Sequence, residues 1–438
     1  MTKKNIILLF LSILFICILS YPSKSDDISS IPTMKENMSL EKAMAIALEN
    51  NPMLNKMKEE YSYMGNMKKE AQSELYPKLY FSTSVGYNNM PNILSNSYNT
   101  ITIPEKGGLN MGLNLMYPLY TGGKITSSIK SAEYKELVAY NEIALMENNV
   151  SYETKRAYFG VLLSLETVKV YEELINLQQE QVKRSEELYK QGKIAYVYLL
   201  KTQNELTKNK QMLNMAIFDK ETKIAEFKES LGISQESEIT FEEKMTAYEF
   251  DKTLQDCLPF VKKRPDVLGV QNIILSAKED INVTKSEYLP QTYIMAMSDY
   301  MNKFMTGTSD YNYGVALTIN FPVFDAGSRD FKTKSAENLL NQYTQEAQKK
   351  ILNAQKEIVS AWWNYTTANQ NIVLSEAAIK EAEEIYKIMN LKYEAGKAIY
   401  LELLDATVNL SLAKLNKYNA IYRNNTAYAE LFKTIGLK

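Results

Sequence analysis

Two acidic residues, Glu402 and Asp405, have the spacing for joint chemistry in this sequence. Residues three positions apart lie on one face of a helix, so the two carboxylates would stack. Stacked carboxylates attract cations, but the charged side chains of a solvated helix face have the same spacing. The residues by themselves favour the solvated face.

The sequence shows no enzyme chemistry. It contains no histidine, which removes Ser-His nucleophiles, His general bases and His-based metal sites. The segment Thr121-Gly122-Gly123-Lys124 is not a phosphate loop, because Pro118 occupies the place of the leading glycine. We expect these glycines to turn the chain from a strand into a helix. The sequence therefore predicts a protein that is not an enzyme and has no catalytic residues.

Sulfur-containing residues offer one possible metal path. Four methionines lie close together in the second half of the chain: Met295, Met297, Met301 and Met305. Thioethers bind soft metals, yet methionine is also a flexible apolar residue, and no Cys or His joins this group. We therefore expect bilayer or interface packing for the methionines and burial for Cys257. No metal site, cofactor or cofactor-binding residue is predicted.

The chain is an internal duplication. Residues 189–200 recur as residues 393–404, at an offset of 204 positions. Farther upstream the offset becomes 213, so the first half holds nine extra residues between Pro77 and Pro118. A period of about 200 residues is far longer than that of solenoid repeats, so each half is predicted to be a complete structural unit.

The first residues have the pattern of a secretory signal peptide. Lys3 and Lys4 precede an apolar run, and Ser23 and Ser25 supply the small residues before a cleavage site. Removing residues 1–25 takes away three lysines and no acid, so the net charge changes from −2 to −5, which argues against a nucleic-acid partner. No later apolar run is long enough for a membrane helix. We predict a signal peptide at 1–25, repeat one at 26–245 and repeat two at 246–438.

Two tracts without proline, of 140 and 116 residues, predict very long helices. Proline breaks helix interiors, so its absence permits them. Gly192 and Gly396 interrupt the tracts where a helix can end in a left-handed residue and the chain can reverse. We expect α-hairpins at 124–231 and 328–435. In the second, apolar residues follow a 4-3 spacing over 347–372, which is typical of a coiled-coil seam.

Alternation of apolar and polar residues predicts four β-strands. Their expected ranges are 79–88, 109–117, 292–301 and 312–321. Runs of about ten residues with one apolar face and one small polar face are typical of outer-membrane barrel strands. The third strand is apolar on both faces, so its orientation stays open. The remaining expected segments are helices at 39–74 and 253–287, each interrupted by an X-Pro step, and loops at 90–107 and 302–310.

Four strands are too few to close a barrel. The smallest known barrels have about eight strands, and lipid does not tolerate open sheet edges. The protein must therefore oligomerise if these strands enter a membrane. A soluble β-sandwich shows the same alternation, but two separated hairpins could not build one.

The order of helix, strand pair and long α-hairpin, given twice, resembles the TolC family of outer-membrane efflux proteins over essentially the whole mature chain. The motifs that carry the resemblance are Asn50-Asn51-Pro52, Lys263-Arg264-Pro265-Asp266-Val267, and the strand-end residues Pro77, Pro118, Gly123, Pro290, Pro322 and Gly327. The resemblance implies a mainly α fold with membrane β-strands. It implies a trimer whose twelve strands close one barrel in the outer membrane, continued by an α-helical barrel across the periplasm. It also implies partners: a membrane-fusion adaptor, an inner-membrane transporter and outer-membrane lipid.

The resemblance also gives the hairpin tips a role. These tips carry Gly192, Lys193, Gly396 and Lys397. The resemblance implies that they contact the adaptor, although helix capping alone accounts for the glycines. For Glu402 and Asp405 it implies rings of acids that constrict the periplasmic entrance. Ala398 departs from the pattern, since some members of the family carry an arginine near this tip.

We therefore expect a trimeric channel that passively conducts substrates delivered by a tripartite efflux pump and opens when an adaptor docks. The exit duct of a type I protein secretion system uses the same fold and stays open as an alternative. A periplasmic coiled-coil structural protein without a pore is the alternative from another class. The strand alternation and the strand-entry prolines oppose it.

Overall fold

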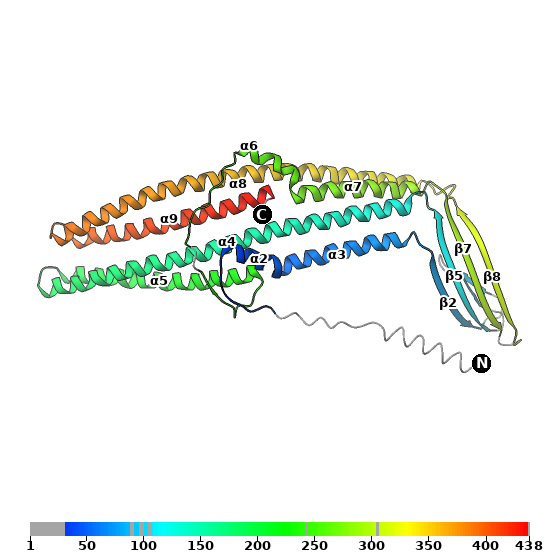
Figure 1. Cartoon of the computed structure of the whole chain (residues 1–438), viewed down its shortest axis with the longest axis horizontal. Helices are drawn as coiled ribbons and strands as arrows, with labels where there is room; N and C mark the ends of the chain where they lie inside the picture. Colours follow the sequence, from blue (N-terminus) through cyan, green and yellow to red (C-terminus); the bar gives the residue numbers. More distant parts are fainter. Residues whose placement is uncertain are drawn as a thin grey trace.

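The computed structural model describes residues 31–87, 92–95, 100–103, 107–241, 244–303 and 306–436. The predicted signal peptide and Met305 lie outside these residues. Long α-hairpins form one end of the molecule and a β-sheet forms the other (Figure 1). None of the described helices is both long and apolar enough to cross a membrane.

The helices repeat in length and in spacing. The long ones are α4 (Lys124–Lys190) and α8 (Ser328–Glu394), of 67 residues each, and α5 (Tyr196–Leu231) and α9 (Tyr400–Ile435), of 36 each. The shorter pair is α3 (Pro52–Ser73) and α7 (Pro265–Ser286), of 22 each. Their starting residues differ by the two offsets found in the sequence, 204 and 213. At about 1.5 Å per residue, α4 and α8 are each roughly 100 Å long.

The helices form one curved layer with two levels. Near the sheet the order of neighbours is α3, α4, α7 and α8; near the hairpin tips it is α5, α4, α9 and α8. Only α4 and α8 run through both levels. The two edges of the layer are therefore α3 with α5 on one side and α8 on the other.

The predicted coiled-coil seam of α8 is confirmed. Ala354, Ile358 and Ala361 are at most 1% exposed, and Tyr365 and Ile372 are also buried. All but Ile372 pack in one cluster with residues of α9, and the small alanine side chains let the two helices approach closely. The apolar spacing read from the sequence therefore marks the face on which the second hairpin closes.

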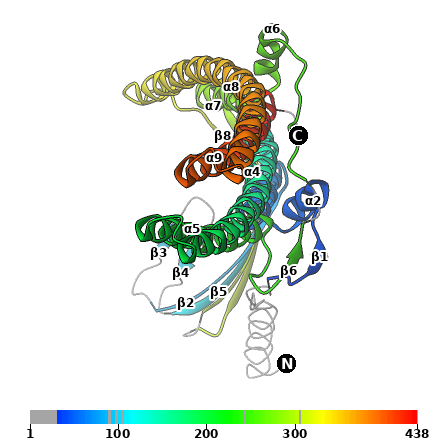
Figure 2. The same ribbon diagram turned by 90° about the vertical axis from the view of Figure 1, so that its left-hand side faces the viewer.

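The middle of the molecule departs from the expected helices. The elements there are α2 (Leu40–Asn50), α6 (Leu254–Cys257), the 3-10 helix η1 (Leu258–Lys263), β1 (Lys35–Asn37) and β6 (Glu238–Thr240). The interruptions predicted at Asn51-Pro52 and Arg264-Pro265 are present, but the segment before Arg264 is a short helix and a 3-10 turn. The parallel pairing of β1 with β6 was not predicted. Figure 2 shows α2, β1 and β6 grouped on the outer side of the curved helix layer, with α6 apart from them at the top of the view.

Side chains of α8 and α9 form hydrogen bonds with the backbone of an extended linker that precedes α6. The Asn425 amide donates to the carbonyl of Thr246 at 2.8 Å and accepts from the backbone N–H of Tyr248 at 3.0 Å. The Trp362 indole N–H donates to the carbonyl of Lys252 at 3.2 Å. These bonds satisfy the backbone of an irregular segment, so the linker crosses the helices in a fixed path.

The sheet contains the four predicted strands. They are β2 (Lys78–Gly86), β5 (Gly108–Tyr120), β7 (Gln291–Lys303) and β8 (Ser309–Asn320), all antiparallel in the order β2-β5-β7-β8. The predicted loop at 302–310 is too long, because β7 and β8 extend into it. The predicted loop at 90–107 contains another antiparallel pair, β3 (Asn92–Ser95) and β4 (Thr100–Ile103).

The register settles the orientation of β7. Leu113 of β5 lies opposite Phe81 of β2 and Ser298 of β7, and Ser298 lies opposite Tyr313 of β8. This face is apolar and open, with Phe81 51% and Tyr313 90% exposed. Because side chains alternate along a strand, Met295 and its neighbours at positions 297 and 301 lie on the other face.

The register thus places these methionines opposite the apolar face, and their expected packing at an interface stays a prediction. Met295 and Met297 share their face with Asn110 and Asn114 and are 40% and 51% exposed. The neighbouring strands, whose alternation is unambiguous, determine which face of β7 joins the apolar side. The apolar character of the methionines has no influence on that choice.

The two repeats place a left-handed glycine at the end of each second long helix. Gly232 has a φ of 70°, and a Cβ there would lie 2.6 Å from the carbonyl oxygen of Asn50. Gly192 has a φ of 69° but no atom within 4 Å of such a Cβ. We expect Gly192→Ala to cost only backbone strain, about 1–2 kcal/mol, and Gly232→Ala to cost more. Thermal unfolding of the two variants measures the difference, and equal midpoints would show that the Asn50 contact relaxes freely.

Candidate functional site

The hairpin tips are sharply capped. Gly192 and Gly396 have φ values of 69° and 68°. Just after them, Lys193 donates its backbone N–H to the carbonyl of Leu188 at 2.9 Å, and Lys397 forms the matching bond at 2.8 Å. These bonds close the helix ends in the manner of a glycine C-cap. Both lysine side chains are exposed, so they are free to meet a partner, and the adaptor contact stays a prediction.

Glu402 and Asp405 lie on the exposed face of the first turns of α9, while Leu403 and Leu404 are buried behind them. The Glu402 carboxylate accepts the backbone N–H of Ile399 at 3.0 Å. Glu402 therefore caps the positive end of its own helix. Asp405 makes no hydrogen bond or ion pair within the part of the chain that the structure describes. The structure brings both carboxylates to one surface, as the spacing predicts.

Contacts between the two hairpins, which the sequence did not predict, lie just behind the tips. The guanidinium carbon of Arg184 lies 5.2 Å from the centre of the Tyr393 ring. Nearby, the Gln181 amide donates to the hydroxyl of Thr407 at 3.2 Å. A cation over an aromatic face contributes about 0.5–1 kcal/mol at an exposed site. These contacts hold the second hairpin against α4 with modest energy.

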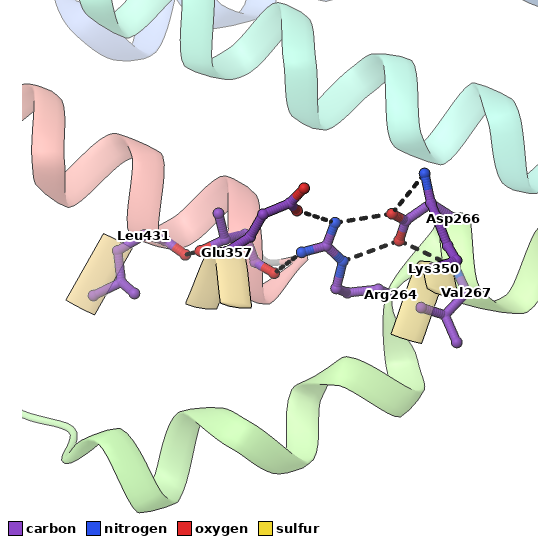
Figure 3. Close-up of polar contacts among 7 residues, drawn as sticks. Arg264, Asp266, Val267, Lys350, Glu357 and Leu431 are labelled. Carbon is purple, nitrogen blue, oxygen red and sulfur yellow. Dashed lines mark hydrogen bonds and ion pairs between the residues drawn. The ribbon is translucent and has the colours of Figure 1, made fainter. Parts of the chain in front are cut away.

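A buried charge network lies at the start of α7 (Figure 3). Arg264 donates two hydrogen bonds to Asp266, at 3.0 and 2.8 Å, and one to Glu357 of α8 at 2.7 Å. It also donates to the carbonyl of Thr434 at the end of α9, at 3.1 Å. Lys350 lies 3.4 Å from the Asp266 carboxylate. One guanidinium thus joins the start of α7, the middle of α8 and the end of α9.

Burial and neighbouring charges shift the pKa values of this network in opposite directions. Burial by itself would raise the pKa of Asp266, but the hydrogen bonds and charges of Arg264 and Lys350 outweigh it and hold that pKa below 3.8. Burial would likewise lower the pKa of Arg264, and its carboxylate partners raise it instead. Both groups are therefore charged at neutral pH, and each depends on the other for its burial.

At the corresponding position, repeat one has a neutral side chain in place of the buried charge. Asn51 stands in the place of Arg264, and its side-chain oxygen accepts the backbone N–H groups of Met53 and Leu54 at 3.0 and 3.2 Å. This is an N-cap for α3. The ionic joint is thus specific to the second repeat.

The strand-end residues lie where helix and sheet meet. Pro77 and Pro290 immediately precede β2 and β7, Pro322 follows β8, and Pro118 lies at a register shift in β5, where its missing N–H is tolerated. Gly123 and Gly327 have φ values of 86° and 83° directly before α4 and α8. They turn the chain from strand to helix, as the sequence predicts.

No resident metal site is visible in the described ranges, where His, Cys, Asp and Glu form no group of three or more that could hold an ion. Cys257 is fully buried, as expected. Burial raises the pKa of its thiol, which favours the unreactive form.

Solved outer-membrane channels have the same fold. The outer-membrane channel OprN matches with a TM-score of 0.78 over 95% of this chain and 96% of its own, at 16% identity. The Campylobacter jejuni CmeC outer membrane channel matches with a TM-score of 0.76 over 91% and 85%, at 18% identity.

Curated relatives are distant in sequence. Outer membrane protein OprJ of Pseudomonas aeruginosa is 22% identical over 42% of this chain and 40% of its own length. Cation efflux system protein CusC of Escherichia coli K12 is 22% identical over 40% and 39%. Toxin and drug export protein A of Aggregatibacter actinomycetemcomitans is 19% identical over 81% and 80%. The alignments with the first two span about two fifths of those proteins.

The fold is that of these solved outer-membrane channels. A family model described as outer membrane efflux protein matches residues 44–232 and 261–437, one block in each repeat. The chain belongs to the outer membrane efflux protein family.

Proposed function

We propose that this protein is the outer-membrane exit duct of a tripartite efflux pump. It conducts substrates passively from the periplasm to the exterior after an adaptor and an inner-membrane transporter dock below it. The observation that carries this proposal is the sheet of four strands with one open apolar face, joined end to end with a layer of long helices. An apolar strand face of this kind suits lipid, and the opposite polar face suits water.

The edges of the layer support assembly with further copies of the chain. Among the strands that the structure describes, β2 and β8 are the unpaired edges of the sheet. On the α8 edge Val373 and Leu374 are each 67% exposed, and on the α5 edge Phe218 is 74% exposed. Unlike edges that meet head to tail generate a closed ring when the rotation from copy to copy closes. We infer a homotrimer of twelve strands and, at each level, twelve helices.

Opening occurs at the hairpin tips in this proposal. Adaptor contact at Gly192-Lys193 and Gly396-Lys397 draws the second hairpin away from α4. The contacts that yield are those of Arg184 with Tyr393 and of Gln181 with Thr407. Each is weak, so docking energy of a few kcal/mol is enough to break them.

A type I secretion duct is the second candidate. The relative named toxin and drug export protein A aligns over 81% of this chain, which favours keeping it. Deleting the gene distinguishes the two functions: loss of efflux raises sensitivity to small toxic compounds, whereas loss of secretion removes a protein from the culture medium.

The experiment that tests the channel is a planar-bilayer recording of the full-length protein purified in detergent. We expect a trimer by light scattering and stepwise ion conductance. A folded monomer that fractionates as soluble periplasmic material and gives no conductance would falsify the proposal and favour a coiled-coil structural protein.

A further inference from the structure

The polar face of the sheet carries a row of thioethers that no part of the proposed mechanism uses. The methionine row consists of Met116, Met295, Met297 and Met301. Met116 and Met295 lie directly opposite each other on β5 and β7, and Met297 follows on the same face. Alternate residues of a strand are about 7 Å apart. The row therefore runs along β7, from the end of the sheet nearest the helices to its far end.

The neighbours of the row leave two of its side chains partly open, since Met295 is 40% and Met297 51% exposed. Ala316 and Gly314 of β8 lie opposite Met295 and Met297. The terminal methyl of Met297 lies 3.6 Å from where a Cβ of Gly314 would be, so this side chain rests over the glycine. The hydroxyl of Thr318 donates to the sulfur of Met295 at 3.6 Å. Packing in an apolar core does not account for side chains exposed in this way.

Unpaired oxygen groups accompany the row. Asp299, on the same face between Met297 and Met301, has no ion pair or hydrogen bond among the described residues. Opposite Met301, Asn110 is only 5% exposed, and its side-chain oxygen has no hydrogen-bond partner there. Met301 also lies opposite Asp310, whose carboxylate is 2.9 Å from the Lys303 amine. The face therefore offers soft sulfur ligands, a carboxylate that lacks a partner and a buried acceptor.

The row begins at a hollow. A cavity of about 530 Å³ lies at the junction of sheet and helices, and its lining includes Met116, Met295, Tyr293 and Thr318. Its lining includes three charged residues, Glu74, Lys78 and Lys124, of which Glu74 and Lys78 form an ion pair with each other. An ion that enters this cavity meets the first two thioethers together.

From this placement we propose that the methionine row conducts soft monovalent cations, of the class of Cu(I) and Ag(I), along the inner wall of the duct. Thioethers select soft metals over Na⁺, K⁺ and Mg²⁺, which prefer oxygen ligands. Several weak sites in series suit conduction, because an ion that binds too tightly at one site does not leave it. The proposal rests on the proposed function, since the row faces a lumen only in a closed ring, where it occurs three times.

The test uses silver ions and the full-length protein in detergent, in buffer without chloride or thiols, with binding measured by calorimetry. In Met295→Leu/Met297→Leu, leucine keeps the apolar volume and removes the sulfur. We expect silver affinity to fall at least about tenfold. The matched control is Met53→Leu/Met111→Leu, in which Met53 is exposed on α3 and Met111 lies on the apolar face of β5. Its affinity should stay that of the parent. The parent and both double variants contain the buried Cys257, so this thiol does not cause a difference between them.

Two outcomes separate this inference from the proposed function. If both double variants bind silver as the parent does, or if both lose silver affinity equally, the methionine row is not a soft-metal path. Potassium conductance of the same preparations in planar bilayers reports the pore independently. A pore that conducts potassium while silver binding ignores Met295 and Met297 overturns only the further inference, and a parent without any conductance overturns the duct itself.

Discussion

Replacing Arg264 with leucine is expected to destabilise the protein by about 3–5 kcal/mol, because it leaves the Asp266 carboxylate buried without its partner. The Arg264 and Asp266 side chains are only 9% and 6% exposed. The substitution also removes the bond to Thr434 that fastens the end of α9. Thermal unfolding of the detergent-solubilised protein should show a clear fall in the midpoint.

The matched control for this prediction is Arg156→Leu. Arg156 pairs with Glu153 on the surface of α4, with side chains 53% and 47% exposed. Surface pairs of this kind contribute about 0–1 kcal/mol. A change at Arg264 as small as the change at Arg156 would contradict the network's structural role. In Arg264→Met/Asp266→Leu, which removes both buried charges, we expect stability to return toward the parent.

The same network predicts acid sensitivity. The folded-state pKa of Asp266 lies below its ordinary value of 3.8, so the stabilisation is complete above about pH 4 and is lost as pH falls through the lower folded-state value. In Asp266→Asn this part of the pH dependence should be absent. Unfolding midpoints of parent and variant between about pH 2 and 6 measure the difference.

Neutralising Glu402 and Asp405 is expected to abolish block by multivalent cations and to reduce the cation preference of the closed pore. In a trimer the pair becomes two stacked rings with six carboxylates, and crowded negative charge at a narrow entrance attracts cations. Both side chains lie on an exposed face, so the trimer should stay folded. Planar-bilayer recordings of Glu402→Ala/Asp405→Ala test this prediction. In the parent, the effect should weaken at about 1 M salt, where the Debye length is about 3 Å.

Two further variants make this prediction sharper. Glu402→Gln/Asp405→Asn removes the charge and keeps a side-chain oxygen for the Ile399 N–H, so it separates charge from helix capping. Glu236→Gln/Glu249→Gln removes two exposed acids elsewhere and should leave block and selectivity unchanged. If all variants behave as the parent, Glu402 and Asp405 are ordinary surface acids.

Most of the helical architecture could be predicted from the sequence, because proline, glycine and apolar spacing act locally. Gly192 and Gly396 end helices wherever the chain lies, and the duplication shows each boundary twice. The buried state of Arg264 could not be predicted, since its partners Glu357 and Thr434 are distant in the sequence. The pairing of β1 with β6 was missed because three-residue strands carry no usable alternation. The orientation of Met295 depends on the register with β5 and β8, which the residues of β7 do not contain.

The matching order of helices and strands has a consequence for the diameter of an assembled ring. Each strand of the sheet has one counterpart among the helices of the level near the sheet. The strand order β2-β5-β7-β8 matches the helix order α3-α4-α7-α8. Packed helices are about 8–10 Å apart, whereas strands are about 4.8 Å apart. Tilting strands by about 45° widens each one's share of the circumference to roughly 7 Å, which is still less than a helix occupies. Measured between backbone axes, a ring with equal numbers of both is therefore wider among its helices, and the chain passes from one width to the other at the level of Pro77, Pro118, Pro290 and Pro322.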